Sequence, residues 1–196
     1  MADATPPDAR PGLVICAWDP GERGWDPIED LSGAPWSPPG ARTDPVAAGD
    51  PEALATVLAA RLEEPTQRAL LLVGRTRRGN DFRVQLRAEN RTLDGVQRLD
   101  GVGPGVVRAT APAAEIVQAL REAGLPARVS SEAEEDAGSY LLYRVLSAVA
   151  DHEATPAVGL LRAPLAAPDA AVQRAVKAAA VAIARHLSPA LRARAV

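Results

Sequence analysis

The sequence predicts an α/β fold, a three-layer α/β/α sandwich whose central sheet is mixed but mostly parallel. Short apolar runs that suit buried strands alternate along the chain with segments in which apolar residues recur at helical spacing. Such alternation favours a mostly parallel sheet with helices on both faces. With 196 residues, 47% of them hydrophobic, the chain can bury one substantial core. We expect a single domain over residues 11–196, after a polar, proline-rich and disordered tail over residues 1–10.

The first third of the chain predicts one strand, a turn-rich stretch and one helix. Gly12–Trp18 (GLVICAW) is a continuous apolar run that is typical of a central buried strand. Residues 32–50 are rich in proline and glycine, so we expect turns there. Asp50 is a good N-cap residue and Pro51 a good first helical residue, which predicts a helix over residues 51–64. The side chains expected on its buried face are those of Leu54, Val57, Leu58 and Leu62.

The middle of the chain predicts three strands and an arginine-rich loop. Ala69–Val73 (ALLLV) is a second apolar run typical of a buried strand. Residues 74–81 are expected to form the loop that leaves its carboxyl end, and they include Arg75, Arg77 and Arg78. Residues 82–87 alternate between apolar and polar side chains, which is the period of a half-exposed strand. A short extended segment is expected over residues 106–109.

The last part of the chain predicts three helices and two strands. The helices are expected over residues 112–123, 137–149 and 168–186, and the strands over residues 127–130 and 156–161. The middle helix has one apolar face, made by Leu141, Leu142, Val145, Leu146 and Val149. Because this helix starts at the end of a strand, where backbone donors and strand-end side chains converge, we expect a functional site near Gly138 and Ser139.

The charge balance and the apolar runs exclude several classes of function. Lys plus Arg number 22 against 25 for Asp plus Glu, so no overall basic field attracts nucleic acid or an anionic membrane. No apolar run approaches the roughly 20 residues that span a bilayer, and the first ten residues do not resemble a signal peptide. The single cysteine, Cys16, is expected to be a buried structural thiol, which favours a cytoplasmic protein. No cofactor or metal site is predicted.

Seven short motifs occur in an informative order. They are WDP at 18–20, LVG at 72–74, VGP at 102–104, TAP at 110–112, LREAGLP at 120–126, AGSY at 137–140 and GLLRAP at 159–164. In this order they resemble the pyroglutamyl peptidase I family, also called pyrrolidone-carboxyl peptidases. The resemblance covers nearly the whole chain, and it implies the fold of that family and a tendency to form homo-oligomers.

The resemblance also implies the positions of a Glu-Cys-His triad, with which family members remove an N-terminal pyroglutamate. The histidine position carries Arg162, and the glutamate position carries Gln85, or Phe82 if the register slips by three residues. The cysteine position carries Gly138 in a gap-free register, or Leu142 if the AGSY motif is the anchor. None of these residues can serve as thiolate nucleophile, as general base or as orienting carboxylate.

The substrate side of the implied pocket has changed as well. Trp18 keeps the first of the two aromatic walls, whereas Gly21 occupies the second, and Trp25 is the candidate for a replacement wall. A pocket glutamine of the family is replaced by Arg75. These exchanges remove ring stacking and add positive charge, so they predict a pocket altered for neutral pyroglutamate.

The favoured hypothesis is a catalytically inactive homologue, a pseudoenzyme that keeps the fold as a binding or assembly module. In a sharper version, four arginines converge and bind an anion, a carboxylate or a phosphate; they are Arg75, Arg77, Arg78 and Arg162. The expected partner is such a small anionic ligand or a peptide N-terminus. In the opposing version, Arg162 pairs with the acidic run and the loop arginines are solvated. That acidic run comprises Glu132, Glu134, Glu135 and Asp136.

Two further hypotheses remain open. An active omega-peptidase with relocated chemistry would use Ser139 as nucleophile and His152 as base. Against this, a serine in the first helical turn is more often a cap, and both His152 and His186 are expected to be solvated. A structural subunit would assemble with itself or with an active paralogue. Trp36 is a candidate contact for such assembly, or else an anchor for its own loop.

Overall fold

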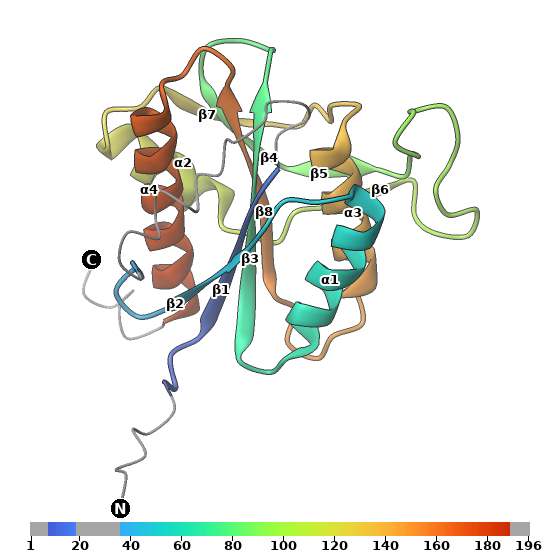
Figure 1. Cartoon of the computed structure of the whole chain (residues 1–196), viewed down its shortest axis with the longest axis horizontal. Coiled ribbons are helices and arrows are strands. Elements are labelled where there is room, and N and C mark those ends of the chain that lie inside the picture. Colours follow the sequence, from blue (N-terminus) through green and yellow to red (C-terminus); the bar gives the residue numbers. More distant parts are fainter. Residues whose placement is uncertain (1–7, 19–35, 189–196) are drawn as a thin grey trace, which may run out of the picture.

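A computed structural model describes residues 8–18 and 36–188 (Figure 1), and in this part of the chain a six-stranded sheet forms the centre. The strand order is β2-β1-β3-β8-β4-β7. Only the β4–β8 pair is antiparallel, and the other four neighbouring pairs are parallel. The strands are β1 (Gly12–Trp18), β2 (Arg42–Val46), β3 (Gln67–Thr76), β4 (Phe82–Gln85), β7 (Ala127–Ser130) and β8 (Ala157–Pro164). The predicted mixed, mostly parallel sheet is therefore confirmed.

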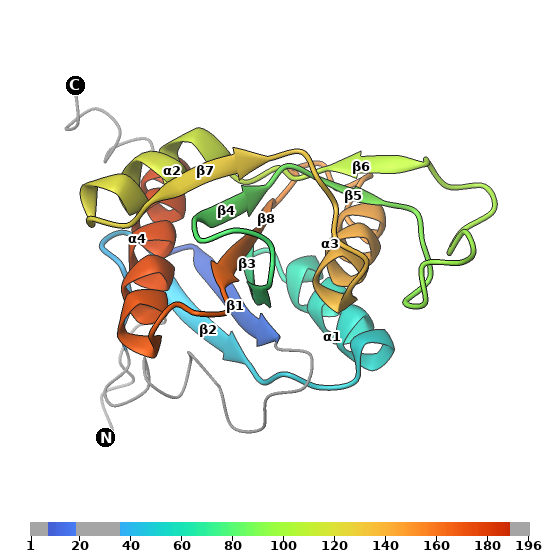
Figure 2. The ribbon, with the colours of Figure 1, turned by 90° about the horizontal axis from the view of Figure 1, so that it is seen from above.

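Four helices cover the sheet in two pairs. They are α1 (Pro51–Glu63), α2 (Ala113–Glu122), α3 (Ala137–Ala148) and α4 (Asp169–Leu187). Helices α1 and α3 lie on one face of the sheet and α2 and α4 on the other, as Figures 1 and 2 show. Each face buries its own apolar cluster against its pair of helices, which gives the predicted three layers.

A short two-stranded ribbon, β5 (Arg87–Glu89) and β6 (Val106–Arg108), lies against α3 outside the main sheet (Figure 2). The long loop between its strands is fixed by Asn90, whose side-chain amide donates to the carbonyl of Asp100 at 2.7 Å and accepts from the Asp100 N–H at 2.9 Å. The hydroxyl of Tyr143 in α3 donates to the carbonyl of Pro104 at 2.9 Å. The ribbon therefore covers the side of α3 opposite α1 (Figure 2).

Three sequence-based expectations about burial are wrong. Val57 is 47% exposed, because α1 packs through Leu54, Leu58 and Leu62 alone of the four residues expected. Strand β4 is buried on both faces rather than half-exposed, because β8 and β7 flank it, α2 covers one face, and Glu134 and Ser139 contact its side chains on the other. Helix α3 is buried all round over its first seven residues, Ala137–Tyr143, because α1, the sheet and the β5–β6 ribbon enclose it.

Two strand boundaries also differ from those expected. Strand β2 lies within the segment for which only turns were expected, and it pairs in parallel with β1 despite Pro45, as an edge strand can. Strand β3 continues to Thr76, because β8 pairs with it as far as Pro164. Arg75 therefore belongs to a strand rather than to the loop that follows. No helix in the described ranges is long and apolar enough to cross a membrane.

The N-cap of α1 gives a first test of the structure. The Asp50 carboxylate accepts hydrogen bonds from the backbone N–H groups of Glu52 and Ala53 at 3.1 and 3.0 Å. We expect Asp50→Ala to lower the free energy of unfolding by about 1 kcal/mol, measured by urea denaturation, because two helical N–H groups lose their acceptor. Asp151→Ala is the matched control, since this exposed side chain makes no hydrogen bond or ion pair in the described part of the chain. Equal effects of the two substitutions would contradict the cap.

Candidate functional site

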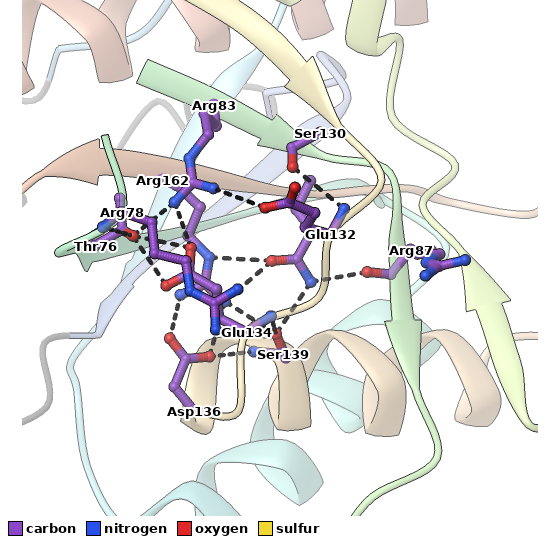
Figure 3. A network of polar contacts seen from close by, with 11 residues as sticks. Thr76, Arg78, Arg83, Arg87, Ser130, Glu132, Glu134, Asp136, Ser139 and Arg162 are labelled. Carbon is purple, nitrogen blue, oxygen red and sulfur yellow. Dashed lines mark hydrogen bonds and ion pairs between the residues drawn. The ribbon is translucent and has the colours of Figure 1, made fainter. Parts of the chain in front are cut away.

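The candidate site lies where the carboxyl ends of β3 and β8 meet the start of α3 (Figure 3). Its centre is Arg162 of β8, whose side chain is only 2% exposed. Asp136, the N-cap of α3, contacts both terminal nitrogens of this guanidinium, and the bond from Nη2 to Oδ1 measures 2.8 Å. The same Oδ1 accepts from the backbone N–H of Ser139 at 2.9 Å. One carboxylate therefore caps the helix and neutralises the buried arginine.

Gln85 of β4 completes the environment of the guanidinium. Its carbonyl oxygen accepts from Nε and Nη2 of Arg162, each at 3.1 Å. Its amide nitrogen donates to the carbonyl of Arg87 at 2.8 Å and to the hydroxyl of Ser139 at 3.0 Å. Hydrogen bonds at both its oxygen and its nitrogen therefore orient the amide of Gln85, and the oxygen fixes the position of the Arg162 guanidinium.

Gly138 lies directly against the guanidinium. A Cβ atom built on Gly138 would stand 2.9 Å from Nη1 of Arg162 and 3.3 Å from both Cζ and Nη2. This contact is closer than a methyl group tolerates, and the guanidinium cannot withdraw because its bonds to Asp136 and Gln85 fix it. With Arg162 in place, position 138 therefore has room for glycine alone.

The hydroxyl of Ser139 is surrounded by hydrogen-bond donors. In addition to the bond from Gln85, it accepts hydrogen bonds from Nη2 of Arg162 at 3.0 Å and from the backbone N–H of Glu134 at 3.2 Å. His152 lies beyond the far end of α3, a 12-residue helix about 18 Å long, and so it does not reach this hydroxyl. In the described part of the chain this hydroxyl makes no hydrogen bond to a carboxylate or an imidazole, and it belongs to a polar network.

A second buried arginine, Arg83 of β4, stands beside the first. It is 1% exposed, and its Nη2 donates to Glu134 at 2.5 Å and to the hydroxyl of Thr76 at 2.7 Å. The carboxylate of Glu134 also accepts from Thr76 at 2.9 Å. Sequence reasoning missed Arg83, because the alternating pattern of β4 placed its polar residues in solvent.

The structure brings together three of the residues at the implied triad positions. Gln85, Gly138 and Arg162 meet in one cluster. The alternative positions do not join them: Phe82 packs in the core on the α2–α4 side of the sheet, and Leu142 packs in the core between the sheet and α1 and α3. The gap-free register is thus the one whose residues share a site.

The predicted convergence of Arg75 with Arg162 is wrong. In the parallel pairing of β3 with β8, Gly74 stands opposite Arg162 and Arg75 opposite Ala163, so the two arginine side chains point to opposite faces of the sheet. Arg75 instead donates to Asp169 of α4 at 2.6 Å and to the carbonyl of Ala167 at 2.6 Å. It therefore fixes the connection from β8 to α4.

The other residues singled out in the sequence lie apart from this cluster or outside the described residues. Arg77 and Arg78 are exposed in the loop after β3, but the backbone N–H of Arg78 joins the polar network by donating to the Thr76 hydroxyl at 3.0 Å (Figure 3). Cys16 is fully buried in β1. His186 faces Glu115 at 3.7 Å. Trp36 is partly buried against the core, with the amine of Lys177 5.6 Å from its ring centre. Trp18 ends β1, while Gly21 and Trp25 lie outside the described residues.

A small cavity of about 50 Å³ adjoins the cluster, between the start of α3 and the loop after β5. Its lining includes Glu134, Asp136, Ser139, Tyr140 and Arg91. Burial raises the pKa of the Tyr140 phenol above its usual value, so this group stays protonated at neutral pH. Within the described ranges, no group of His, Cys, Asp and Glu side chains could hold a metal ion.

Fold and site together define a three-layer α/β/α sandwich with its polar cluster at the carboxyl ends of parallel strands. The sequence matches the pyroglutamyl peptidase family over residues 74–192, more than half of the chain, and the protein therefore belongs to this family. The predicted resemblance is confirmed. A search of curated proteins found no significant match.

Solved structures of the family share the fold. Pyroglutamyl peptidase I from Bacillus amyloliquefaciens superimposes with a TM-score of 0.75 at 19% identity, covering 89% of this chain and 95% of that one. Pyrrolidone carboxyl peptidase from Thermococcus litoralis gives 0.75 at 17% identity, covering 90% and 94%. The enzyme from Thermus thermophilus gives 0.69 at 22% identity, covering 86% and 98%.

The contact between Gly138 and Arg162 gives a test of the site. We expect Gly138→Ala to lower the free energy of unfolding by about 1–3 kcal/mol through overpacking, although alanine in a helix is otherwise favoured over glycine by about 1 kcal/mol. In an Arg162→Ala background, Gly138→Ala should instead raise the free energy of unfolding, because the guanidinium that crowds position 138 is absent.

Gly101→Ala serves as the control, since nothing lies within 4 Å of a Cβ atom built there. Stabilisation by Gly138→Ala in the presence of Arg162, measured by urea denaturation, would contradict the described contact.

Proposed function

We propose that this protein is a catalytically inactive member of the pyroglutamyl peptidase family, which uses the peptidase fold for binding or assembly. One observation carries the proposal: Arg162, Gln85 and Gly138 share a single hydrogen-bonded cluster. These are the positions at which the family resemblance implies histidine, glutamate and cysteine. The proposal therefore treats the cluster as a former catalytic centre.

The chemistry of the replacements argues against hydrolysis. A cysteine peptidase needs a thiolate to attack, an imidazole to accept and return a proton, and a carboxylate to orient the imidazole. Glycine has no nucleophile, a guanidinium cannot accept a proton, and an amide cannot offer the charge of a carboxylate. Loss of one triad member alone typically lowers the rate by about four to six powers of ten.

The contacts of the cluster also argue against relocated chemistry. Ser139 is the nearest hydroxyl, but its neighbours Arg162, Gln85 and the Glu134 N–H are donors and not bases. Any nucleophile at position 138 would collide with Arg162. The arginine therefore supports a role in structure or in recognition of negative charge, which a guanidinium performs well.

An assay of pyroglutamyl hydrolysis tests the proposal. We expect purified protein to release no coumarin from pyroglutamyl-aminomethylcoumarin above the buffer rate, even at high protein concentration. A Ser139→Ala preparation, purified in the same way, should give the same trace and controls for contaminating peptidases. Turnover that scales with protein concentration and is abolished by Ser139→Ala would overturn the proposal in favour of an active omega-peptidase.

A further inference from the structure

The two buried arginines form a matched pair. Arg83 and Arg162 are direct partners in the antiparallel β4–β8 register, so their side chains leave the same face of the sheet with Cβ atoms about 5 Å apart. Both are almost completely buried. Two buried positive charges at this distance require two negative partners. The same segment supplies both partners, Glu134 to Arg83 and Asp136 to Arg162.

The segment that carries these carboxylates, residues 131–136, is held mainly by side-chain interactions. It contains no helix or strand. Its N–H groups at Glu132 and Glu134 donate to the hydroxyls of Ser130 and Ser139 rather than to backbone carbonyls. Glu135, 67% exposed, reaches outward to Arg91. A segment attached in this way opens at a lower free energy than the strands around it.

Residues 131–136 do not provide a hydrogen-bond acceptor for every N–H group of the two arginines. Among the described residues, the buried Nε of Arg83 has no hydrogen-bond partner, and the ion-pair partner of its Nη1 is Glu132 at 3.9 Å. The cavity of about 50 Å³ adjoins this segment: its lining includes Ala133, Glu134 and Glu135, but neither Arg83 nor Arg162. The arginines thus have a spare donor, and space adjoins the segment that covers them.

We propose that Arg83 and Arg162 form a binding site for a small dicarboxylate, which Glu134 and Asp136 occupy when no ligand is present. A dicarboxylate of four or five carbons offers one carboxylate to each of two arginines whose Cβ atoms lie about 5 Å apart. Ligand binding displaces residues 131–136, and each arginine exchanges an internal carboxylate for an external one. The inference deepens the proposed function and rests on it in one respect, namely that the polar cluster performs no hydrolysis.

Calorimetry with succinate on the full chain tests the site. Because Glu134 competes with the ligand for Arg83, Glu134→Gln should bind succinate at least tenfold more tightly than the unaltered protein. Arg83→Gln should bind it at least tenfold more weakly than the unaltered protein. Glu135→Gln is the matched control, since it makes the same charge change in the same segment without touching either buried arginine.

Hydrogen exchange of the unaltered protein provides a second measurement that does not depend on how well the variants fold. Saturating succinate should increase exchange at residues 131–135, whereas propionate, with one carboxylate, should leave it unchanged. Absence of succinate binding to both the unaltered protein and folded Glu134→Gln would overturn the inference, as would equal tightening in Glu135→Gln. Neither result bears on the hydrolysis assay, so failure here and failure of the proposed function are distinguishable.

Discussion

The interaction on which the site depends is the neutralisation of the buried Arg162 at the carboxyl end of β8. A guanidinium that is 2% exposed must have a charged partner and must direct its N–H groups at acceptors. Asp136 is the charged partner, and the carbonyl oxygen of Gln85 is an acceptor for the N–H groups. Asp136 also caps the start of α3 by accepting from the backbone N–H of Ser139. The start of the helix, the path of residues 131–136 and the amide orientation at β4 all follow from this one charge.

The same constraint limits which residue can stand at position 138. Gly138 stands where a side chain would collide with Arg162, so a nucleophile at 138 and an arginine at 162 exclude each other. On the neighbouring strand β4, Arg83 forms a similar buried ion pair with Glu134. Such buried ion pairs add little net stability compared with apolar packing, but they fix one conformation strongly, because a broken pair leaves a buried charge.

The sequence predicted the layers of the fold well and the polar cluster only in part. Apolar runs and helix caps are local signals, so β1, the start of α1 at Asp50 and the order of elements could be predicted. The face to which a strand residue points depends on its neighbours across the sheet, which is why Arg75 was placed beside Arg162 and Arg83 was overlooked. Strand β2 was missed because an edge strand with a proline lacks an apolar run.

A double-mutant cycle between Arg162 and Asp136 tests the central claim most directly. Asp136→Asn keeps a good N-cap but removes the charge, and Arg162→Met keeps the length of the side chain. Each single substitution should lower the free energy of unfolding by about 3 kcal/mol, and the double variant should lose at least about 2 kcal/mol less than the sum. Effects that add to within about 0.5 kcal/mol would contradict the account, because the two groups would then not depend on each other.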